Sequence, residues 1–264
     1  MLRTAFLAAA LPFSIASASA QILYSESFSL VTDTTRRVAG QIQPDLDVRT
    51  QRRLLVQFEN RVDVSVRLGK SAFTVANKLE VARFGSETLL SGGYAYAEYR
   101  RLTEGAYRSE FHAQVQWADA RGLDARTAAG YYARLRLRSD SVWQAFAGLG
   151  PFVERERWSY RGIDEEDRPA GPTPDARTRL KYGAYLAAKV RPSERWAADV
   201  SVYLQSAFDA GLGDARLALS AQASYRFTRY LSAVALYQNL YDGAPVVPIA
   251  PWYHRADFGL SVSF

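Results

Sequence analysis

His112 and His254 are the only histidines in the chain, and they are therefore the first candidates for a general base. Such a base, acting with a serine and an asparagine or acid, could hydrolyse a lipid or another ester. His112 lies in a stretch of alternating polar and apolar residues, and the alternation points it away from the apolar face. An enzyme acting on membrane lipid would need its site on that face. We therefore expect both histidines to be structural, and we predict no catalytic residue.

Metal and cofactor sites lack the residues that they usually need. The chain has no cysteine and no two histidines at ligand spacing. The acidic residues 164–167 could meet a divalent cation, but they lie in a polar stretch where solvated loop charge explains them better. Gly148 and Gly150 fall inside an expected strand and do not precede a helix, so they form no phosphate-binding loop. We predict no metal and no cofactor.

Charged side chains that alternate with apolar ones are the larger set of candidates. In residues 54–68, most even-numbered positions are apolar and the residues between them are largely charged or polar, so a strand would place one set on each face. The net charge of +6 is spread along the chain, which indicates a charged interior and no nucleic-acid partner. The candidates for lining that interior are Glu59, Arg61, Glu110, Arg134, Arg136, Lys181, Asp199, Arg216, Arg226, Arg255 and Asp257.

The same alternation recurs along the chain and predicts about twelve strands. An even number of antiparallel strands suits a closed barrel with both chain ends on one side. The predicted strands are residues 37–49, 54–68, 72–84, 89–102, 108–118, 126–138, 142–160, 179–190, 196–208, 215–227, 231–241 and 253–264.

The connections alternate between short and long, as they do in barrels that have short periplasmic turns and longer external loops. The expected periplasmic turns are residues 69–71, 103–106, 139–141, 192–195 and 228–230, and the external loops include 161–175, 210–214 and 242–252. We expect residues 161–175, the longest and most polar connection, to form an exposed, mobile loop.

Aromatic residues at the strand ends predict two membrane-interface girdles. One comprises Trp143, Trp196, Phe227, Tyr230 and Phe264 beside the short turns, and the other comprises Trp117, Trp158, Phe208, Tyr241 and Trp252 near the long loops.

Both ends of the sequence carry features of exported proteins. Arg3, the apolar residues 5–15 and the sequence Ala18-Ser19-Ala20 are typical of a secretory signal peptide, and no later run approaches the ~20 apolar residues of a transmembrane helix. We predict a signal peptide at 1–20, an N-terminal periplasmic segment or plug at 21–35 and a barrel at 36–264. The chain ends on Phe264 with apolar residues two, four and six positions earlier, which resembles the signal read by the barrel-assembly machinery.

The predicted fold is therefore an all-β transmembrane antiparallel up-and-down barrel of about 12 strands in the bacterial outer membrane, in contact with its lipid. The composition agrees, because 48% hydrophobic residues with a mean hydropathy of −0.20 is what alternation gives. A soluble β-sandwich or lipocalin-like barrel is the alternative, but it would leave Phe264 and the unequal connections unexplained.

Several short stretches resemble the YdiY-like, domain-of-unknown-function family of salt-induced outer-membrane proteins. They are Gln114-Val-Gln116, Arg126 with Ala129-Gly130-Tyr131, Gly148-Leu149-Gly150 leading to Glu154 and Glu156, and Asn239-Leu-Tyr241 through Pro245 to Asp257. The resemblance implies an outer-membrane barrel and supplies no activity or site.

Three functions remain open from the sequence. The first is a narrow porin-like channel for small polar or ionic solutes, which applies if inward charges segregate to opposite walls. The second is a non-conducting structural or interaction barrel whose external loops contact a partner, which applies if those charges pair across the interior. The third, an outer-membrane lipid hydrolase, depends on the histidines.

Overall fold

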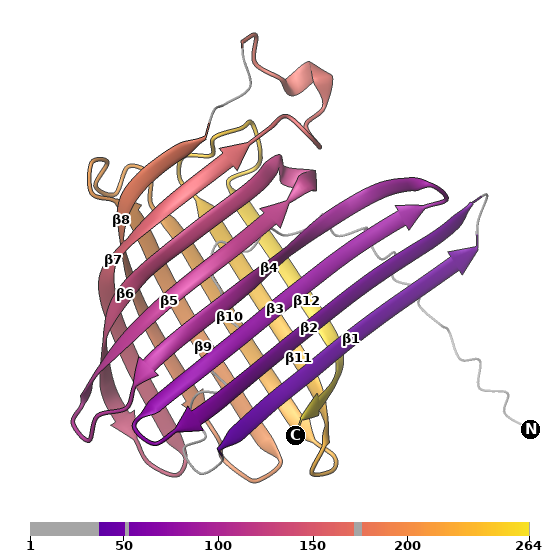
Figure 1. Ribbon diagram of the computed structural model, residues 1–264. Coiled ribbons are helices and arrows are strands. Elements are labelled where there is room, and N and C mark those ends of the chain that lie inside the picture. The colour runs from indigo at the N-terminus through magenta and orange to yellow at the C-terminus, as the bar shows by residue number, and fades with distance from the viewer. Residues whose placement is uncertain (1–36, 51–52, 172–175, 264) are drawn as a thin grey trace, which may run out of the picture.

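Twelve antiparallel strands close into one barrel in the computed structural model, which describes residues 37–50, 53–171 and 176–263 (Figure 1). Each strand pairs with its sequence neighbours, and β1 pairs with β12. The strands are β1 Val38–Thr50, β2 Leu54–Leu68, β3 Ser71–Phe84, β4 Glu87–Arg101, β5 Tyr107–Ala118, β6 Leu123–Ser139, β7 Trp143–Trp158, β8 Arg177–Val190, β9 Trp196–Ala207, β10 Arg216–Arg226, β11 Leu231–Asp242 and β12 Trp252–Ser263. The predicted up-and-down barrel of twelve strands is confirmed.

The strand bounds agree with the alternation to within a few residues. Residues 54–68 match β2 at both ends, whereas β6 begins at Leu123, before the predicted residue 126. The reason is a short 3-10 turn, Asp119–Arg121, that ends on Gly122 with φ 70 and returns the chain directly into the sheet. The predicted signal peptide, the segment 21–35 and Phe264 lie outside the described residues.

The two ends of the barrel differ in their connections. The short-turn end holds the connections β2–β3, β4–β5, β6–β7, β8–β9 and β10–β11, all of which are brief. The opposite end, called the long-loop end here, holds the three longer connections β7–β8, β9–β10 and β11–β12, together with the short connections β1–β2, β3–β4 and β5–β6. β1 begins and β12 ends at the short-turn end, where the two strands pair (Figure 1).

The two faces of the sheet reverse the pattern of a water-soluble protein. Large apolar side chains on the outer face are exposed, with Leu186 at 60% and Phe258 at 82%, while charged side chains inside are buried, with Arg216 and Lys181 at 1%. This inversion is typical of strands whose outer side faces lipid and whose inner side faces a polar interior. No helix among the described residues is long and apolar enough to cross a membrane.

Tyrosine rings fill part of the interior because glycines on β7 and β8 leave room for them. Tyr132, Tyr185 and Tyr203 form a buried cluster, in which the rings of Tyr132 and Tyr185 meet edge to face with centroids 5.3 Å apart. A Cβ at Gly148 would lie 2.1 Å from the Tyr185 ring, so only glycine fits beneath it.

The long loops pack together over their end of the barrel. Ile163, from the connection after β7, and Val247, from the connection after β11, are buried with Leu123 and Trp158. The loop 161–175 was expected to be exposed. This is wrong at Ile163, whose apolar side chain is buried in the apolar cluster. Trp158 was expected in the aromatic girdle near the long loops. This is also wrong, since its ring is buried in the same apolar cluster.

The remaining girdle residues that the structure describes lie on or near the outside. Trp143, Trp196, Phe227 and Tyr230 are exposed at the short-turn end, and Phe208 and Trp252 are exposed at the long-loop end.

Candidate functional site: the barrel interior

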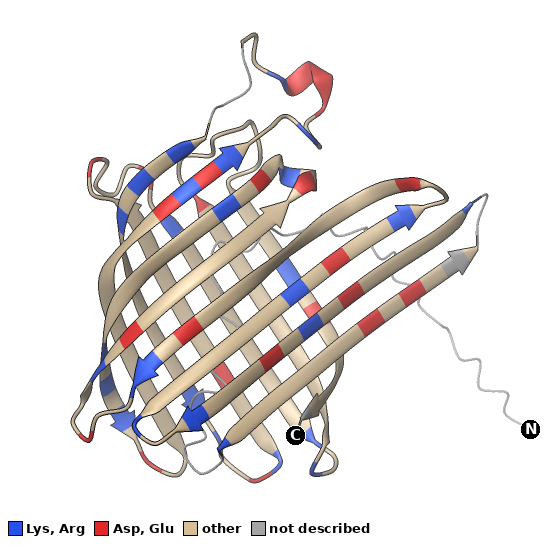
Figure 2. Cartoon of the chain, in the orientation of Figure 1, with Lys and Arg blue, Asp and Glu red and all other residues tan. Residues whose placement is uncertain are grey.

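The charged residues of the interior gather into three clusters, each joining strands that are three apart around the barrel. Residues of both signs occur along β2, β3, β4 and β7, whereas the charged residues of β8 are all basic (Figure 2). The clusters are named here by position. The loop-end cluster is Arg126, Glu154, Glu156, Lys181 and Arg216, the turn-end cluster is Glu98, Arg100, Glu110, Arg134 and Tyr185, and the seam cluster is Glu59, Lys78, Glu80, Arg255 and Asp257.

In the loop-end cluster, two glutamates of β7 are surrounded by cations. Glu154 Oε1 accepts from Lys181 Nζ at 2.6 Å and from Arg216 Nη1 at 3.0 Å. Glu156 Oε1 lies 2.6 Å from Arg126 Nη2 and 2.7 Å from Arg216 Nη1. Because β10 carries Arg216 and β7 carries both glutamates, the contacts cross β8 and β9 inside the barrel.

In the turn-end cluster, one carboxylate oxygen collects three donors. Glu110 Oε2 accepts from Arg100 Nη2 at 3.1 Å, from Arg134 Nη1 at 3.1 Å and from the Tyr185 hydroxyl at 3.0 Å. The Arg134 guanidinium also lies 3.9 Å from the centroid of the Phe146 ring. All four donors and acceptors are buried, so the network fixes the side chains that narrow this part of the interior.

In the seam cluster, a single arginine of β12 extends past β1 and contacts both β2 and β3. Arg255 Nη1 lies 3.1 Å from Glu80 Oε2 on β3, and Arg255 Nη2 contacts Glu59 on β2. Its Nε donates to Asp257 Oδ2 at 2.7 Å, and Lys78 Nζ lies 3.3 Å from Glu59 Oε1. The cluster therefore joins both sides of the strand pair that closes the barrel.

The other predicted lining residues are divided between the interior and its rim. Arg61 is buried and donates to Gln43, and Asp199 lies 3.4 Å from Lys189 Nζ. Arg136 instead bonds carbonyl oxygens of the β4–β5 turn, and Arg226 is exposed at the short-turn end. Arg136 lies beyond Arg134 toward the end of β6, and Arg226 is the last residue of β10, so both arginines lie near the short-turn end of the barrel.

Sequence reasoning did not include several of the most buried members among the lining candidates. Glu98 and Arg100 were omitted because alternation in β4 is weakened by Tyr99 and Arg101 on the opposite face. Glu154 and Glu156 entered only through a family resemblance, although they alternate with Val153 and Arg155 as clearly as any pair in the chain. The period of two alone would have placed both glutamates inside.

The two histidines lie on opposite faces of the sheet. The His112 ring stacks on Tyr132 with centroids 4.8 Å apart and faces Phe152, inside the barrel. His254 is exposed on the outer face, where Nδ1 lies 2.7 Å from Asn239 Nδ2 and 2.9 Å from the Tyr237 hydroxyl.

Among residues 37–50, 53–171 and 176–263, no group of three histidines and acids is placed to hold a metal ion. The acidic 3-10 turn Glu165–Asp167 is exposed.

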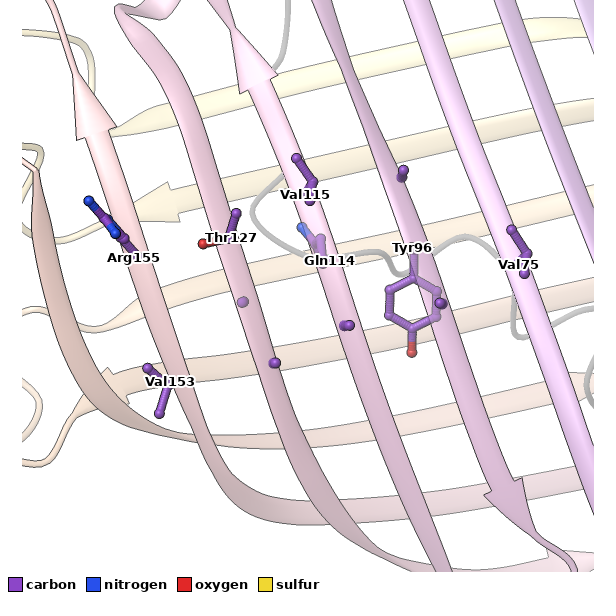
Figure 3. A pocket seen from close by; sticks show the side chains of 12 residues that line it. Val75, Tyr96, Gln114, Val115, Thr127, Val153 and Arg155 are labelled. Atoms are coloured by element: carbon purple, nitrogen blue, oxygen red, sulfur yellow. The ribbon is translucent and has the colours of Figure 1, made fainter.

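A groove of about 550 Å³ lies across β3 to β7 (Figure 3). It arises where Ala97, Ala113 and Ala129 interrupt the larger outward side chains, such as Val75 and Val153. Its lining is mostly alanine and valine. The groove is therefore a depression in the outer surface, and its lining does not suggest a catalytic site.

Outside the strands, one acid organises the connection between β9 and β10. Asp214 Oδ1 accepts from Ser206 Oγ at 2.7 Å and from the Ala207 amide at 3.1 Å, and its Oδ2 pairs with Arg179. Partial burial raises the pKa of Asp214, but these hydrogen bonds and the arginine outweigh it and lower the pKa below its usual value.

Comparison with known proteins gives likenesses among solved structures. A KdgM porin matches with a TM-score of 0.44 at 10% identity, covering 86% of this chain and 99% of that one. A NanC porin matches with a TM-score of 0.43 at 10% identity, covering 86% and 98%. The toluene transporter TodX of Pseudomonas putida matches with a TM-score of 0.36 at 11% identity, covering 84% and 78%.

No family model and no curated protein matches the chain. The resemblance to the YdiY-like family therefore stays a prediction.

Proposed function

We propose that this protein is a barrel of the bacterial outer membrane that conducts small polar or ionic solutes through a constricted interior. The observation that carries the proposal is the inversion of polarity between the two faces of the sheet. Exposed leucine, valine and phenylalanine side chains cover the outside, and buried charges of both signs cover the inside. Such a wall suits lipid outside and a polar path inside.

The exposed apolar surface supports a membrane location, because the same surface would be unfavourable in water. The outer face carries a long series of exposed apolar side chains, among them Leu149, Leu180 and Leu186. In water that surface would drive aggregation, since monomeric soluble proteins rarely expose large contiguous apolar patches. The short turns and long loops agree with insertion from the periplasm, and Phe264 fits recognition by the barrel-assembly machinery.

The constriction sets the size of the solute. Arg216, Tyr185 and Arg255 each reach carboxylates on strands three positions away, which narrows the interior from three sides. We expect passage of hydrated ions or small polar molecules and exclusion of large ones.

Planar-bilayer recording of the refolded protein tests this function. Small stepwise currents that scale with salt concentration are expected. A fully inserted barrel that gives no step at several salt concentrations contradicts conduction.

A non-conducting barrel is the second candidate, because the interior charges do form ion pairs. These pairs join strands up to three apart, whereas opposite walls of a twelve-stranded barrel are six strands apart, so the pairs do not span the full width of the interior and are compatible with a narrow path. The external surface of a non-conducting barrel would carry the function through the long loops. Deleting residues 165–174, which leaves Ile163 in place, is expected to leave folding intact and to abolish binding to a partner in the envelope. Pull-down experiments with the deletion variant and with the full chain measure this difference.

We propose no enzymatic activity. The parent protein is expected to hydrolyse no lipid or ester. Hydrolysis by the parent protein that disappears in His112→Ala or in His254→Ala would contradict this.

A further inference from the structure

The strand pair that closes the barrel is joined over a small part of its length. Between β1 and β12 the described residues form two pairs, Gln41 with Ser263 and Ile42 with Val262, whereas β1 and β2 form thirteen. Figure 1 shows β1 diverging from β12 toward the long-loop end. We call the stretch facing this divergence, residues 43–48 of β1 and 252–260 of β12, the seam.

A proline stands where the hydrogen-bonded ladder stops. The bond from the Arg67 amide to the Arg37 carbonyl shows that odd-numbered residues of β1 direct their backbone groups toward β2. Even-numbered residues therefore direct theirs toward β12. Pro44 is the first even-numbered residue beyond Ile42, and it has no N–H to donate.

Side-chain charge opposes closure further along the seam. Continuing the register of Ile42 with Val262 would place Asp47 directly opposite Asp257. Like charges facing each other across an antiparallel pair are destabilising. The missing donor at Pro44 is the feature that ends the ladder. The facing acids add a smaller cost, because acids also face each other within intact ladders, at Asp45 with Glu59 and at Glu59 with Glu80.

An open seam in lipid cannot be left empty. Unpaired backbone groups facing hydrocarbon cost several kcal/mol each, so they need a polar occupant or water. The seam has polar residues on its inner side, including Asp45 and Asp257, and exposed apolar residues on its outer side, including Leu46 and Phe258. That combination matches a molecule with one polar and one apolar end.

The inner side also specifies the charge of the polar end. Among the described residues on the inner side there, Asp45, Asp47, Glu59, Glu80 and Asp257 face Arg61, Lys78 and Arg255. Acids therefore exceed bases, and a cationic group would compete with Arg255 for Glu59 and Glu80. An anionic group would be less favoured, because the acids there outnumber the bases.

From these observations we propose that the seam is a lateral opening that binds an amphiphile with a cationic head, the head lying against Glu59 and Glu80 and the apolar chain passing between β1 and β12 into the membrane. The proposal rests on the membrane location, and it is independent of conduction along the barrel axis. Arg255 spans the opening while the amphiphile is absent.

Cysteine cross-linking tests the opening, because the chain has no cysteine of its own. Leu46→Cys combined with Phe258→Cys places thiols at positions that would be partners if the seam closed. Leu46→Cys combined with Phe58→Cys is the matched control, because Leu46 and Phe58 are partners in the β1–β2 ladder. Both variants are refolded in phosphatidylcholine vesicles, and folding is checked by heat-modifiable gel migration.

The control pair is expected to form its disulfide at least about tenfold faster than the seam pair under the same oxidant. Equal rates would mean that β1 and β12 are zipped together in the membrane, and they would overturn the proposal whatever the conductance measurement shows.

The occupant is tested with dodecyltrimethylammonium and dodecyl sulfate, at equal concentrations below those that disrupt the vesicles. Dodecyltrimethylammonium is expected to slow seam cross-linking a further threefold or more and to leave the control unchanged, while dodecyl sulfate has no such effect. An equal effect of both amphiphiles would overturn the cationic assignment.

Glu59→Gln with Glu80→Gln is expected to remove the difference between the two amphiphiles. If this double variant does not fold, the exposed Asp45→Asn provides the same test, with a reduced difference expected. A difference of undiminished size in the variant that folds contradicts binding of the head at these acids.

Discussion

At the level of single residues, Glu154 is a buried acid that several cations of the loop-end cluster share. Lys181 and Arg216 both contact it, and all three side chains are 2% exposed or less. A buried ion pair gains little over an apolar pair, but removing one partner leaves a buried charge uncompensated. Loss of Glu154 should therefore matter far more than loss of an exposed acid.

Glu154→Gln keeps the size of the side chain and removes its charge. We expect it to lower the free energy of unfolding by about 3 kcal/mol, because Lys181 loses its carboxylate partner. Urea titration of the refolded protein in lipid vesicles measures this. Glu104→Gln is the control, since Glu104 is 95% exposed in its pair with Lys70, and its effect should stay within about 0.5 kcal/mol. Equal effects at both positions would contradict the buried network.

The pKa of Asp214 predicts a pH dependence for the β9–β10 connection. Its folded-state pKa lies below the unfolded value, so the carboxylate stabilises the fold above the usual aspartate pKa of about 3.9 and loses that contribution as the pH falls through the folded value. Asp214→Asn should lower the melting temperature at pH 7, and the gap to the parent protein should close at low pH. Asp164→Asn, in an exposed loop, should change neither. A gap that persists unchanged at low pH would contradict this linkage.

Which interior residues meet could not be predicted from the sequence. Alternation assigns Glu110 and Arg134 to the inner face, but it cannot say that Tyr185, three strands away, also reaches Glu110. That contact depends on barrel curvature and on the space left by Gly148, which are tertiary properties. The burial of Ile163 and Trp158 beneath the long loops was missed for the same reason.

At the level of the strands, the alternation of polar and apolar residues with a period of two predicted where the strands lie. It located β2 at both ends because Val62, Val64 and Val66 alternate without interruption. It was weaker in β4, where tyrosines stand on both faces. The early end of the β1–β12 ladder was not predicted, although Pro44 was visible in the sequence, because its effect depends on which neighbour its nitrogen faces.

Glycine in β7 gives a test of packing between strands. Gly148→Ala would place a Cβ 2.1 Å from the Tyr185 ring, so the ring must move and disturb its bond to Glu110. We expect a loss of about 1–3 kcal/mol in unfolding free energy. Gly259→Ala in β12 meets nothing within 4 Å and should be tolerated. The account of the tyrosine cluster fails if the two substitutions have the same effect on urea unfolding.

At the level of the whole molecule, the outer surface predicts where charge is tolerated. Leu186→Arg introduces a cation on the outer face of β8 and should destabilise the inserted barrel by about 2–4 kcal/mol if that position lies near the middle of the membrane. Leu212→Arg, in the exposed connection between β9 and β10, should have little effect. Unfolding in vesicles distinguishes the two. Equal tolerance would contradict a lipid-facing β8.

The central claim, conduction through a constricted polar interior, is tested most directly by single-channel recording of Tyr185→Ala beside Tyr182→Ala. Tyr185 points into the interior and bonds Glu110, whereas Tyr182 lies on the opposite face of the same strand, against Phe208. We predict small steps for the parent protein, severalfold larger steps for Tyr185→Ala and unchanged steps for Tyr182→Ala. Inserted barrels that give no steps in any of the three proteins would contradict the claim.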